Sequence, residues 1–133
     1  MGAARRRYRR RPGQDVVAVQ LKLDTDGFAY RKWGAEQRCK PGDWLVDNNG
    51  DLYTVDAAVF ARTYRPSGKG TYLKATPVWA EIAARDGFVQ TKEGRSRYAA
   101  GDYLVYNEEG GGDAYCMSRA KFEAMYEPDP SDP

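Results

Sequence analysis

The residues best suited to chemistry in this chain form a run of arginines near its N-terminus. Six arginines surround one tyrosine in a segment made of Arg5, Arg6, Arg7, Tyr8, Arg9, Arg10 and Arg11. Planar guanidinium groups bind phosphate oxygens through paired hydrogen bonds, and a tyrosine ring can stack on a base. The segment therefore predicts an arm that contacts nucleic acid or another polyanion. It would also suit an acidic membrane or protein surface, or would be a solvated leader without a partner.

A second basic segment carries aromatic rings between its charges. Phe28 and Tyr30 alternate with other residues just before Arg31 and Lys32. Rings and cations in alternation are typical of a strand on which bases stack. A half-buried hairpin with one solvated, charged face explains the same residues, and we favour that interpretation. Tyr30, Arg31 and Lys32 complete the predicted set of anion-binding residues.

The composition excludes several kinds of catalytic site. The chain has no histidine, the usual general base at neutral pH and the commonest metal ligand. Its two cysteines, Cys39 and Cys116, are too few for a four-ligand zinc site, and we expect both thiols to be reduced. The carboxylates fall in no glycosidase or calcium-loop pattern. We therefore predict no catalytic residue, no metal site and no cofactor.

The net charge is an average over two unlike parts of the chain. The 133 residues carry 21 Lys and Arg against 19 Asp and Glu, which gives +2. Without the six arginines of the arm, the remainder is mildly acidic. No apolar run approaches the ~20 residues of a membrane span, and Pro12 and Gly13 follow the arm where a secretory signal would be apolar. We expect a cytoplasmic protein.

An internal repeat organises the rest of the chain. Residues 40–48 recur as residues 99–107, and residues 51–66 recur as residues 113–128. A unit of roughly 50 residues has little core of its own. The pattern therefore predicts a tandem duplication whose two copies pack as one domain about a pseudo-twofold axis.

Each copy is expected to contain short antiparallel strands followed by one helix, in a β-rich α+β fold. The strands of the first copy are predicted at 16–23, 28–33, 44–46 and 52–55, with a helix at 57–64. Asp56 and Ser118 are suited to cap the two helices, and Asn49-Gly50 is suited to a tight hairpin turn. The i, i+4 spacing of Phe60 and Tyr64, and of Phe122 and Tyr126, predicts one stacked pair of rings on each helix. Residues 78–84 fit either a strand or the start of a helix. We expect the sheet edges to close into a small barrel or to pair between the copies.

The predicted boundaries follow from this pattern. They are a disordered arm at 1–14, repeat unit 1 at 15–66, a linker or first strand of unit 2 at 67–76, repeat unit 2 at 77–128, and a disordered tail at 129–133.

Two aspartates occupy matching turns of the copies. Asp43 and Asp102 each follow a glycine and precede an aromatic residue. Because the same pair occurs in both copies, we interpret these carboxylates as acceptors for local backbone N–H groups rather than as catalytic groups.

The repeated motifs resemble those of a known family. The first is Pro41-Gly42-Asp43-Trp44-Leu45-Val46, followed by Tyr53 and by Phe60-x-x-x-Tyr64. The second is Gly101-Asp102-Tyr103-Leu104-Val105, followed by Phe122-x-x-x-Tyr126-Glu127, with Ala100 in place of the proline. They resemble the PGDYG-type proteins of bacteria and their phages, in which a Pro-Gly-Asp-aromatic turn leads through a short hairpin to a helix. The resemblance implies that local fold and no activity.

These features predict a non-enzymatic module that binds nucleic acid or another polyanion through its arm. The alternative is a structural or assembly protein, of phage type or oligomeric, that pairs through sheet edges. The third class is an enzyme or small-ligand binder with a cleft between the repeats. We expect removal of the arm to leave the fold intact.

Overall fold

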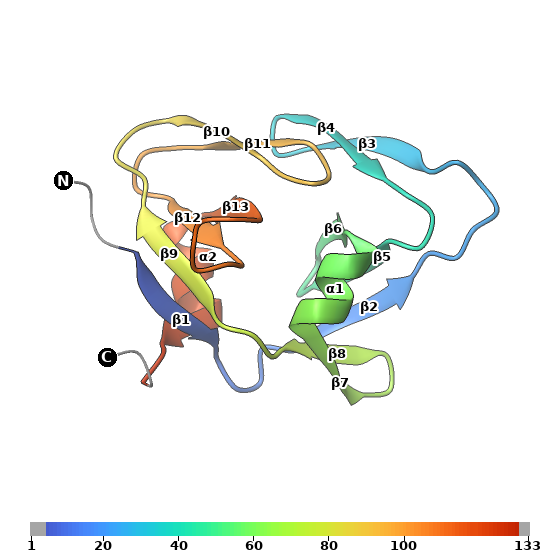
Figure 1. Cartoon of the computed structure of the whole chain (residues 1–133), viewed down its shortest axis with the longest axis horizontal. Coiled ribbons are helices and arrows are strands. Elements are labelled where there is room, and N and C mark those ends of the chain that lie inside the picture. The colour runs from blue at the N-terminus through green and yellow to red at the C-terminus, as the bar shows by residue number, and fades with distance from the viewer. Residues whose placement is uncertain (1–4, 131–133) are drawn as a thin grey trace.

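The computed structural model describes residues 5–130, in which short strands dominate and two helices follow matching hairpins (Figure 1). The strands are β1 (Arg6–Arg10), β2 (Val16–Gln20), β3 (Phe28–Lys32), β4 (Ala35–Cys39), β5 (Trp44–Asn48), β6 (Asp51–Val55), β7 (Tyr64–Gly68), β8 (Thr71–Lys74), β9 (Val78–Ile82), β10 (Gly87–Gln90), β11 (Arg95–Tyr98), β12 (Tyr103–Tyr106), β13 (Ala114–Met117) and β14 (Tyr126–Pro128). The helices are α1 (Ala57–Thr63) and α2 (Arg119–Met125). The predicted β-rich α+β class is confirmed.

Two five-stranded antiparallel sheets lie side by side, and their strand orders correspond. One sheet has the order β6-β5-β2-β8-β7 and the other has the order β13-β12-β9-β1-β14. Each strand of the first sheet thus has a counterpart at the same place in the second. Neither sheet closes on itself among residues 5–130, so the expected barrel is wrong.

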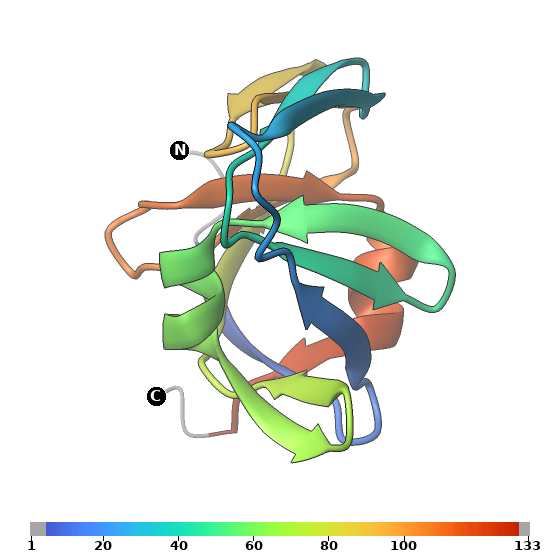
Figure 2. The same cartoon turned by 90° about the vertical axis from the view of Figure 1, so that its right-hand side faces the viewer.

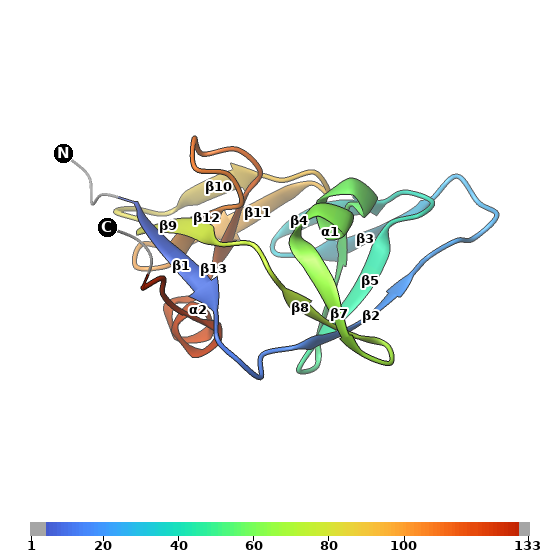
Figure 3. The same cartoon turned by 60° about the horizontal axis from the view of Figure 1, so that its bottom comes forward.

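Each sheet includes one strand that comes from the other half of the chain. Strand β1 lies between β9 and β14, whereas β8 lies between β2 and β7. Figure 3 shows the connections from β1 to β2 and from β8 to β9 running between the sheets. The registers match: Tyr8 is opposite Val78 and Pro128, and the equivalent residue of β8 is Tyr72, opposite Val16 and Pro66.

The prediction of a disordered arm is therefore wrong for residues 6–10, which form strand β1. Within β1, Tyr8 packs edge-on against Phe122, with ring centroids 4.9 Å apart. Arginines of the same strand lie beside carboxylates of neighbouring strands, as in the pair of Arg9 and Glu127 at 2.6 Å. Alternation of packed and charge-paired side chains stabilises a strand in spite of its charge.

Helices α1 and α2 each contribute side chains to the hydrophobic core of one sheet. Asp56 caps α1 by accepting from the backbone N–H of Ala58 and Val59, and Ser118 caps α2, as predicted. The predicted ring pairs are also confirmed. Phe60 stacks on Tyr64 at 4.6 Å, and the buried Phe122 stacks on Tyr126 at 4.8 Å.

Two hairpins, β3–β4 and β10–β11, form a layer across one end of both sheets (Figures 1 and 2). Their turns interlock, because Arg38 N–H donates to the Glu93 carbonyl and Arg97 N–H donates to the Trp33 carbonyl. Between them the fully buried Gln37 donates through its side-chain amide to the Lys32 and Arg95 carbonyls. These bonds hold the halves of the molecule together at that end.

No helix among residues 5–130 is long and apolar enough to cross a membrane. Residues 78–84, which fitted either a strand or a helix, contain β9. Residues 1–4 and 131–133, and with them the ends of the predicted arm and tail, lie outside the described residues.

Candidate functional site: a cavity between the two sheets

A cavity of about 340 Å³ lies between the sheets and is lined by both halves of the chain. Its lining includes a cation from each of the two exchanged strands, Arg10 of β1 and Lys74 of β8. Tyrosines from β6, β7, β13 and β14 also line it: Tyr53, Tyr64, Tyr115 and Tyr126. The volume falls within the range of small-molecule sites.

Arg10 and Lys74 occupy equivalent registers, opposite Tyr126 and Tyr64 respectively. Both residues are only 6% exposed. The Arg10 guanidinium donates to the hydroxyls of Tyr126 at 3.0 Å and Tyr64 at 3.2 Å, and to the Gln14 carbonyl. The Lys74 ammonium donates to the Tyr115 hydroxyl at 2.9 Å.

Neither of these buried cations forms an ion pair with a carboxylate in residues 5–130. The Arg10 Nε atom is buried and has no hydrogen-bond partner there. Burying a charge without a counter-charge lowers the free energy of unfolding by roughly several kcal/mol, and buried charges in proteins are therefore normally paired. The cavity lining therefore holds two buried cations that have no carboxylate partner among the described residues.

Two tyrosines joined by a hydrogen bond lie between the cations. The hydroxyls of Tyr115 and Tyr126 are 3.3 Å apart, so hydrogen bonds run from Lys74 through both phenols to Arg10. Burial alone would raise the pKa of Tyr126, but the charges of Arg10 and Lys74 lower it to about 7. Burial and the neighbouring Tyr126 raise the pKa of Tyr115 well above its usual value. Tyr126 is the phenol of this pair that loses its proton first.

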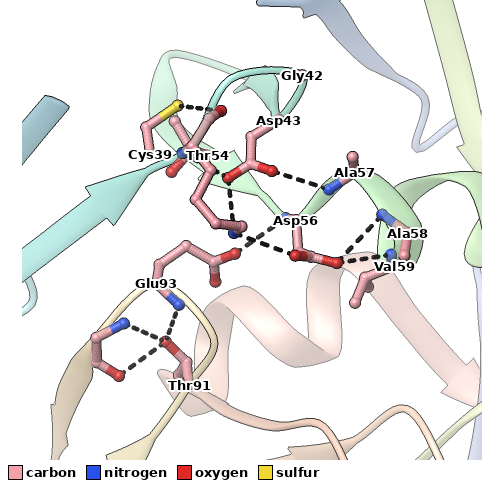
Figure 4. Close-up of polar contacts among 12 residues, drawn as sticks. Cys39, Gly42, Asp43, Thr54, Asp56, Ala57, Ala58, Val59, Thr91 and Glu93 are labelled. Atoms are coloured by element: carbon pink, nitrogen blue, oxygen red, sulfur yellow. Dashed lines mark hydrogen bonds and ion pairs between the residues drawn. The ribbon is translucent and has the colours of Figure 1, made fainter. Parts of the chain in front are cut away.

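The turns of the two interlocked hairpins bring Trp33 and Glu93 to the cavity lining. Trp33 has a φ of 56°, a left-handed conformation that is unusual for a bulky residue and that carries its ring to 5.8 Å from the ring of Tyr53. The Glu93 carboxylate accepts the backbone N–H of Asp56 at 2.9 Å (Figure 4). Thr91 shapes the Glu93 turn by accepting the N–H groups of Glu93 and Gly94.

Burial raises the pKa of the Glu93 carboxyl from 4.5 to about 7, although the Asp56 N–H and the Lys40 charge partly oppose the shift. Glu93 therefore holds a proton in the folded chain over a pH range in which the unfolded chain has released it. The free energy of unfolding contributed by this group should accordingly fall as the pH rises from about 4.5 to about 7.

We expect Glu93→Gln to stabilise the protein at about pH 8 by about 1–3 kcal/mol, because the amide oxygen can still accept from Asp56 while the buried charge is removed. Below about pH 4.5 the variant and the parent chain should have the same stability. Urea unfolding across this pH range measures the difference. A stabilisation that is constant with pH would contradict the assignment.

The structure does not bring the ten predicted anion-binding residues together. Of the ten, Arg10 is the one that lines the cavity in the part of the chain described here. Four other arginines form ion pairs with carboxylates: Arg5 with Glu81, Arg7 with Asp129, and Arg9 and Arg11 with Glu127. Tyr8 packs on Phe122, and Arg6 is exposed with its guanidinium 5.9 Å from the Tyr8 ring centroid.

The three predicted residues of β3 lie in an antiparallel hairpin with β4. The Tyr30 hydroxyl binds the side chain and backbone N–H of Thr54, and Lys32 pairs with Asp51 at 2.8 Å. Arg31, between them, is exposed. Tyr30 and Lys32 thus each bind a residue of β6 in the first sheet.

The sequence pattern did not reveal Lys74, Glu93 or the four cavity tyrosines as site residues. Lys74 fell within residues 67–76, predicted as a linker or as the first strand of unit 2, and Tyr64 and Tyr126 were interpreted as helix-stacking rings. One signal was available: Tyr53, Tyr64, Tyr115 and Tyr126 recur at a constant offset in the repeat, and each has a hydroxyl that needs a partner when buried.

Comparison with known proteins gave no match: no family model, no curated protein and no solved structure is similar to the chain. The resemblance to the PGDYG-type proteins therefore stays a prediction, as do the cytoplasmic location, the nucleic-acid contact and the assembly role. The cavity is the feature from which a function can be argued.

Proposed function

We propose that this protein is a non-enzymatic binding protein whose ligand is a small anion held in the cavity between the sheets. The observation that carries the proposal is the pair of buried cations, Arg10 and Lys74, which lie at equivalent positions beside the cavity without carboxylate partners. An anion between them would supply the missing counter-charge. Charge-assisted hydrogen bonds to buried groups such as these are stronger than those at the surface.

The arrangement of donors supports a carboxylate or a tetrahedral oxyanion as the bound group. The unpartnered Arg10 Nε, the Lys74 ammonium and the tyrosine hydroxyls are all able to donate hydrogen bonds. The walls beyond them are aromatic at Trp33 and Tyr53, which suits an apolar or planar remainder of the ligand.

We also infer that the chain is a tandem duplication in which each copy begins with the strand given to the other. The matching strand orders and the matching registers of Arg10 and Lys74 support this inference. In this view each copy contributes one cation and two tyrosines to a site on a pseudo-twofold axis. A ligand with two anionic ends would use both cations.

Lys74→Met tests the site directly. We expect the parent chain to be stabilised against heat by sulfate or by a C4 dicarboxylate, since a ligand at 100 times its Kd contributes about 2.7 kcal/mol. We expect this stabilisation to be lost in Lys74→Met and in Arg10→Met. The matched controls are Lys69→Met and Arg6→Met, which remove exposed charges from the β7–β8 turn and from β1. A parent chain that none of these anions stabilises would contradict the proposal, and so would equal stabilisation of Lys74→Met.

At about pH 6, where Tyr126 keeps its proton, Lys74→Met should raise the free energy of unfolding of the ligand-free chain by about 1 kcal/mol, because a buried cation without a counter-charge is replaced by an apolar chain of similar length. Urea unfolding of both chains in a buffer free of multivalent anions measures the difference. A loss of more than about 2 kcal/mol would show instead that Lys74 serves the fold.

A further inference from the structure

We propose that anion binding in this cavity is coupled to the uptake of one proton by Tyr126. This inference rests on the proposed function and explains how the empty site balances the charges of its two cations. The Tyr126 hydroxyl oxygen accepts from Arg10, and it lies 3.3 Å from the hydroxyl of Tyr115, which itself accepts from Lys74.

The protons on these groups can be assigned from their donor capacities. Arg10 and Lys74 only donate, so each phenol oxygen already accepts from one cation. One hydroxyl proton fills the contact between the two phenols, so the phenol that accepts this bond has no acceptor for its own proton among the groups bonded to it. Tyr126 is that phenol, because Arg10 and Lys74 both lower its pKa whereas burial raises the pKa of Tyr115.

Deprotonation of Tyr126 removes the proton that lacks an acceptor in the empty cavity. The phenolate accepts from Arg10 and from Tyr115, needs no acceptor of its own and places a negative charge between two cations. The lowered pKa of Tyr126, which burial opposes and the two cations bring to about 7, agrees with this arrangement. The phenolate is thus the internal counter-ion of the site.

A bound anion changes both the charge and the hydrogen bonds around Tyr126. A second negative charge beside Arg10 and Lys74 disfavours the phenolate, and an anionic oxygen supplies the acceptor that the Tyr126 hydroxyl lacked. Tyr126 therefore takes one proton from solvent and donates it in a hydrogen bond to the ligand. No other bond forms or breaks.

The coupling predicts how affinity depends on pH. Below the pKa of Tyr126 the phenol is already protonated, and anion binding takes up no proton. Above that pKa the proton must be taken from solvent, so the affinity falls by up to about tenfold for each pH unit.

Other ionisable groups face the same space. They are Arg10 on β1, Asp51 and Tyr53 on β6, Asp56 before α1, Tyr64 on β7, Lys74 on β8, Lys92 and Glu93 in the β10–β11 turn, Arg97 on β11, Asp102 before β12, Asp113 before β13, Tyr115 and Cys116 on β13, and Lys121 on α2. Glu93 is the one whose pKa, raised by burial to about 7, lies in the same range as that of Tyr126. The test must therefore separate Tyr126 from Glu93.

Isothermal titration calorimetry of the full chain with sulfate provides the measurement. Sulfate does not titrate near neutral pH, so the difference in heat between two buffers of unlike ionisation enthalpy counts the protons taken up. We expect close to one proton per sulfate at about pH 8.5 and none at about pH 6. The tyrosinate absorbance band in the near ultraviolet should decrease on binding at the higher pH.

Three variants assign the proton. Tyr126→Phe should bind sulfate without proton uptake, whereas Glu93→Gln and Tyr30→Phe should retain it; Tyr30 is a tyrosine outside the cavity lining. Sulfate binding by the parent chain without proton uptake would overturn this inference and leave the proposed function standing. Uptake that persists in Tyr126→Phe and disappears in Glu93→Gln would also overturn it. Absence of any binding would contradict the proposed function itself.

Discussion

A chain that lacks residues 1–13 should fail to fold. This deletion removes β1, which pairs with β9 through Arg6, Arg7 and Tyr8 and with β14 through Tyr8 to Arg10. Strand β14 would lose its ladder partner, and the buried Phe122 would lose the ring of Tyr8. Tyr8 is half-buried, and removal of a fully buried aromatic side chain costs about 3–5 kcal/mol, so the loss of Tyr8 together with a strand from the interior of the sheet is comparable to the whole stability of many domains.

Circular dichroism with thermal melting measures this effect. The parent chain should melt cooperatively, and the deleted chain should show no cooperative transition. The matched control is the full-length triple variant Arg5→Gln, Arg6→Gln, Arg9→Gln, which removes charge and keeps the strand. Because exposed ion pairs contribute about 0–1 kcal/mol each, the control should melt cooperatively, with a modest loss of stability. If the deleted chain melted at the same temperature as the parent, the result would support the disordered arm that the sequence predicted.

The failure of that interpretation has a physical reason. Seven consecutive positions with six cations are typical of a solvated segment, and local sequence offers no carboxylate to compensate them. The partners of Arg9 and Arg5 are Glu127 and Glu81, far along the chain. Only pairing with β9 and β14 brings them near, and no local pattern predicts such long-range pairing.

Local features were predicted well where a short segment determines its own structure. The caps Asp56 and Ser118, the ring pairs on α1 and α2, and the strand from Phe28 to Lys32 are all present. Turn and cap chemistry acts over two to four residues, so the sequence alone specifies it.

The candidate site could not be predicted in the same way. Lys74 lies in a segment that was predicted as a linker or as a first strand, and its burial depends on β8 entering the sheet of the other half of the chain. The cavity forms where β1 and β8 place Arg10 and Lys74 at equivalent registers. The similarity within the sequence indicates which residues correspond, but not that β1 and β8 each pair with strands from the other half of the chain.

Asp43→Ala is expected to have the second-largest effect among the variants considered. Asp43 is 1% exposed, and its carboxylate accepts from the backbone N–H of Lys40 at 2.9 Å, the Lys40 ammonium at 3.0 Å and the backbone N–H of Ala57 at 3.1 Å (Figure 4). These bonds confirm the structural interpretation of this residue. They tie the turn before β5 to the first turn of α1.

Removing the Asp43 carboxylate leaves the backbone N–H groups of Lys40 and Ala57 without their acceptor, whereas the exposed Lys40 ammonium keeps its second partner, Asp56, at 3.1 Å. Buried backbone groups left unpaired cost about 1–3 kcal/mol each. We expect a loss of about 3–5 kcal/mol for Asp43→Ala and, at a few degrees per kcal/mol, a melting temperature lower by roughly 10 °C or more.

Asp102→Ala is the matched control from the other half of the chain. Asp102 occupies the equivalent turn, but it is only partly buried, and the bond found for its carboxylate among the described residues is from the backbone N–H of Ala99 at 2.9 Å. Loss of one such bond should cost about 1 kcal/mol. Urea unfolding of both variants compares two aspartates that the repeat makes equivalent. Equal losses would mean that the bond from Ala57 N–H and the ion pair with Lys40 contribute nothing, and that the shared turn alone explains why both copies carry an aspartate there.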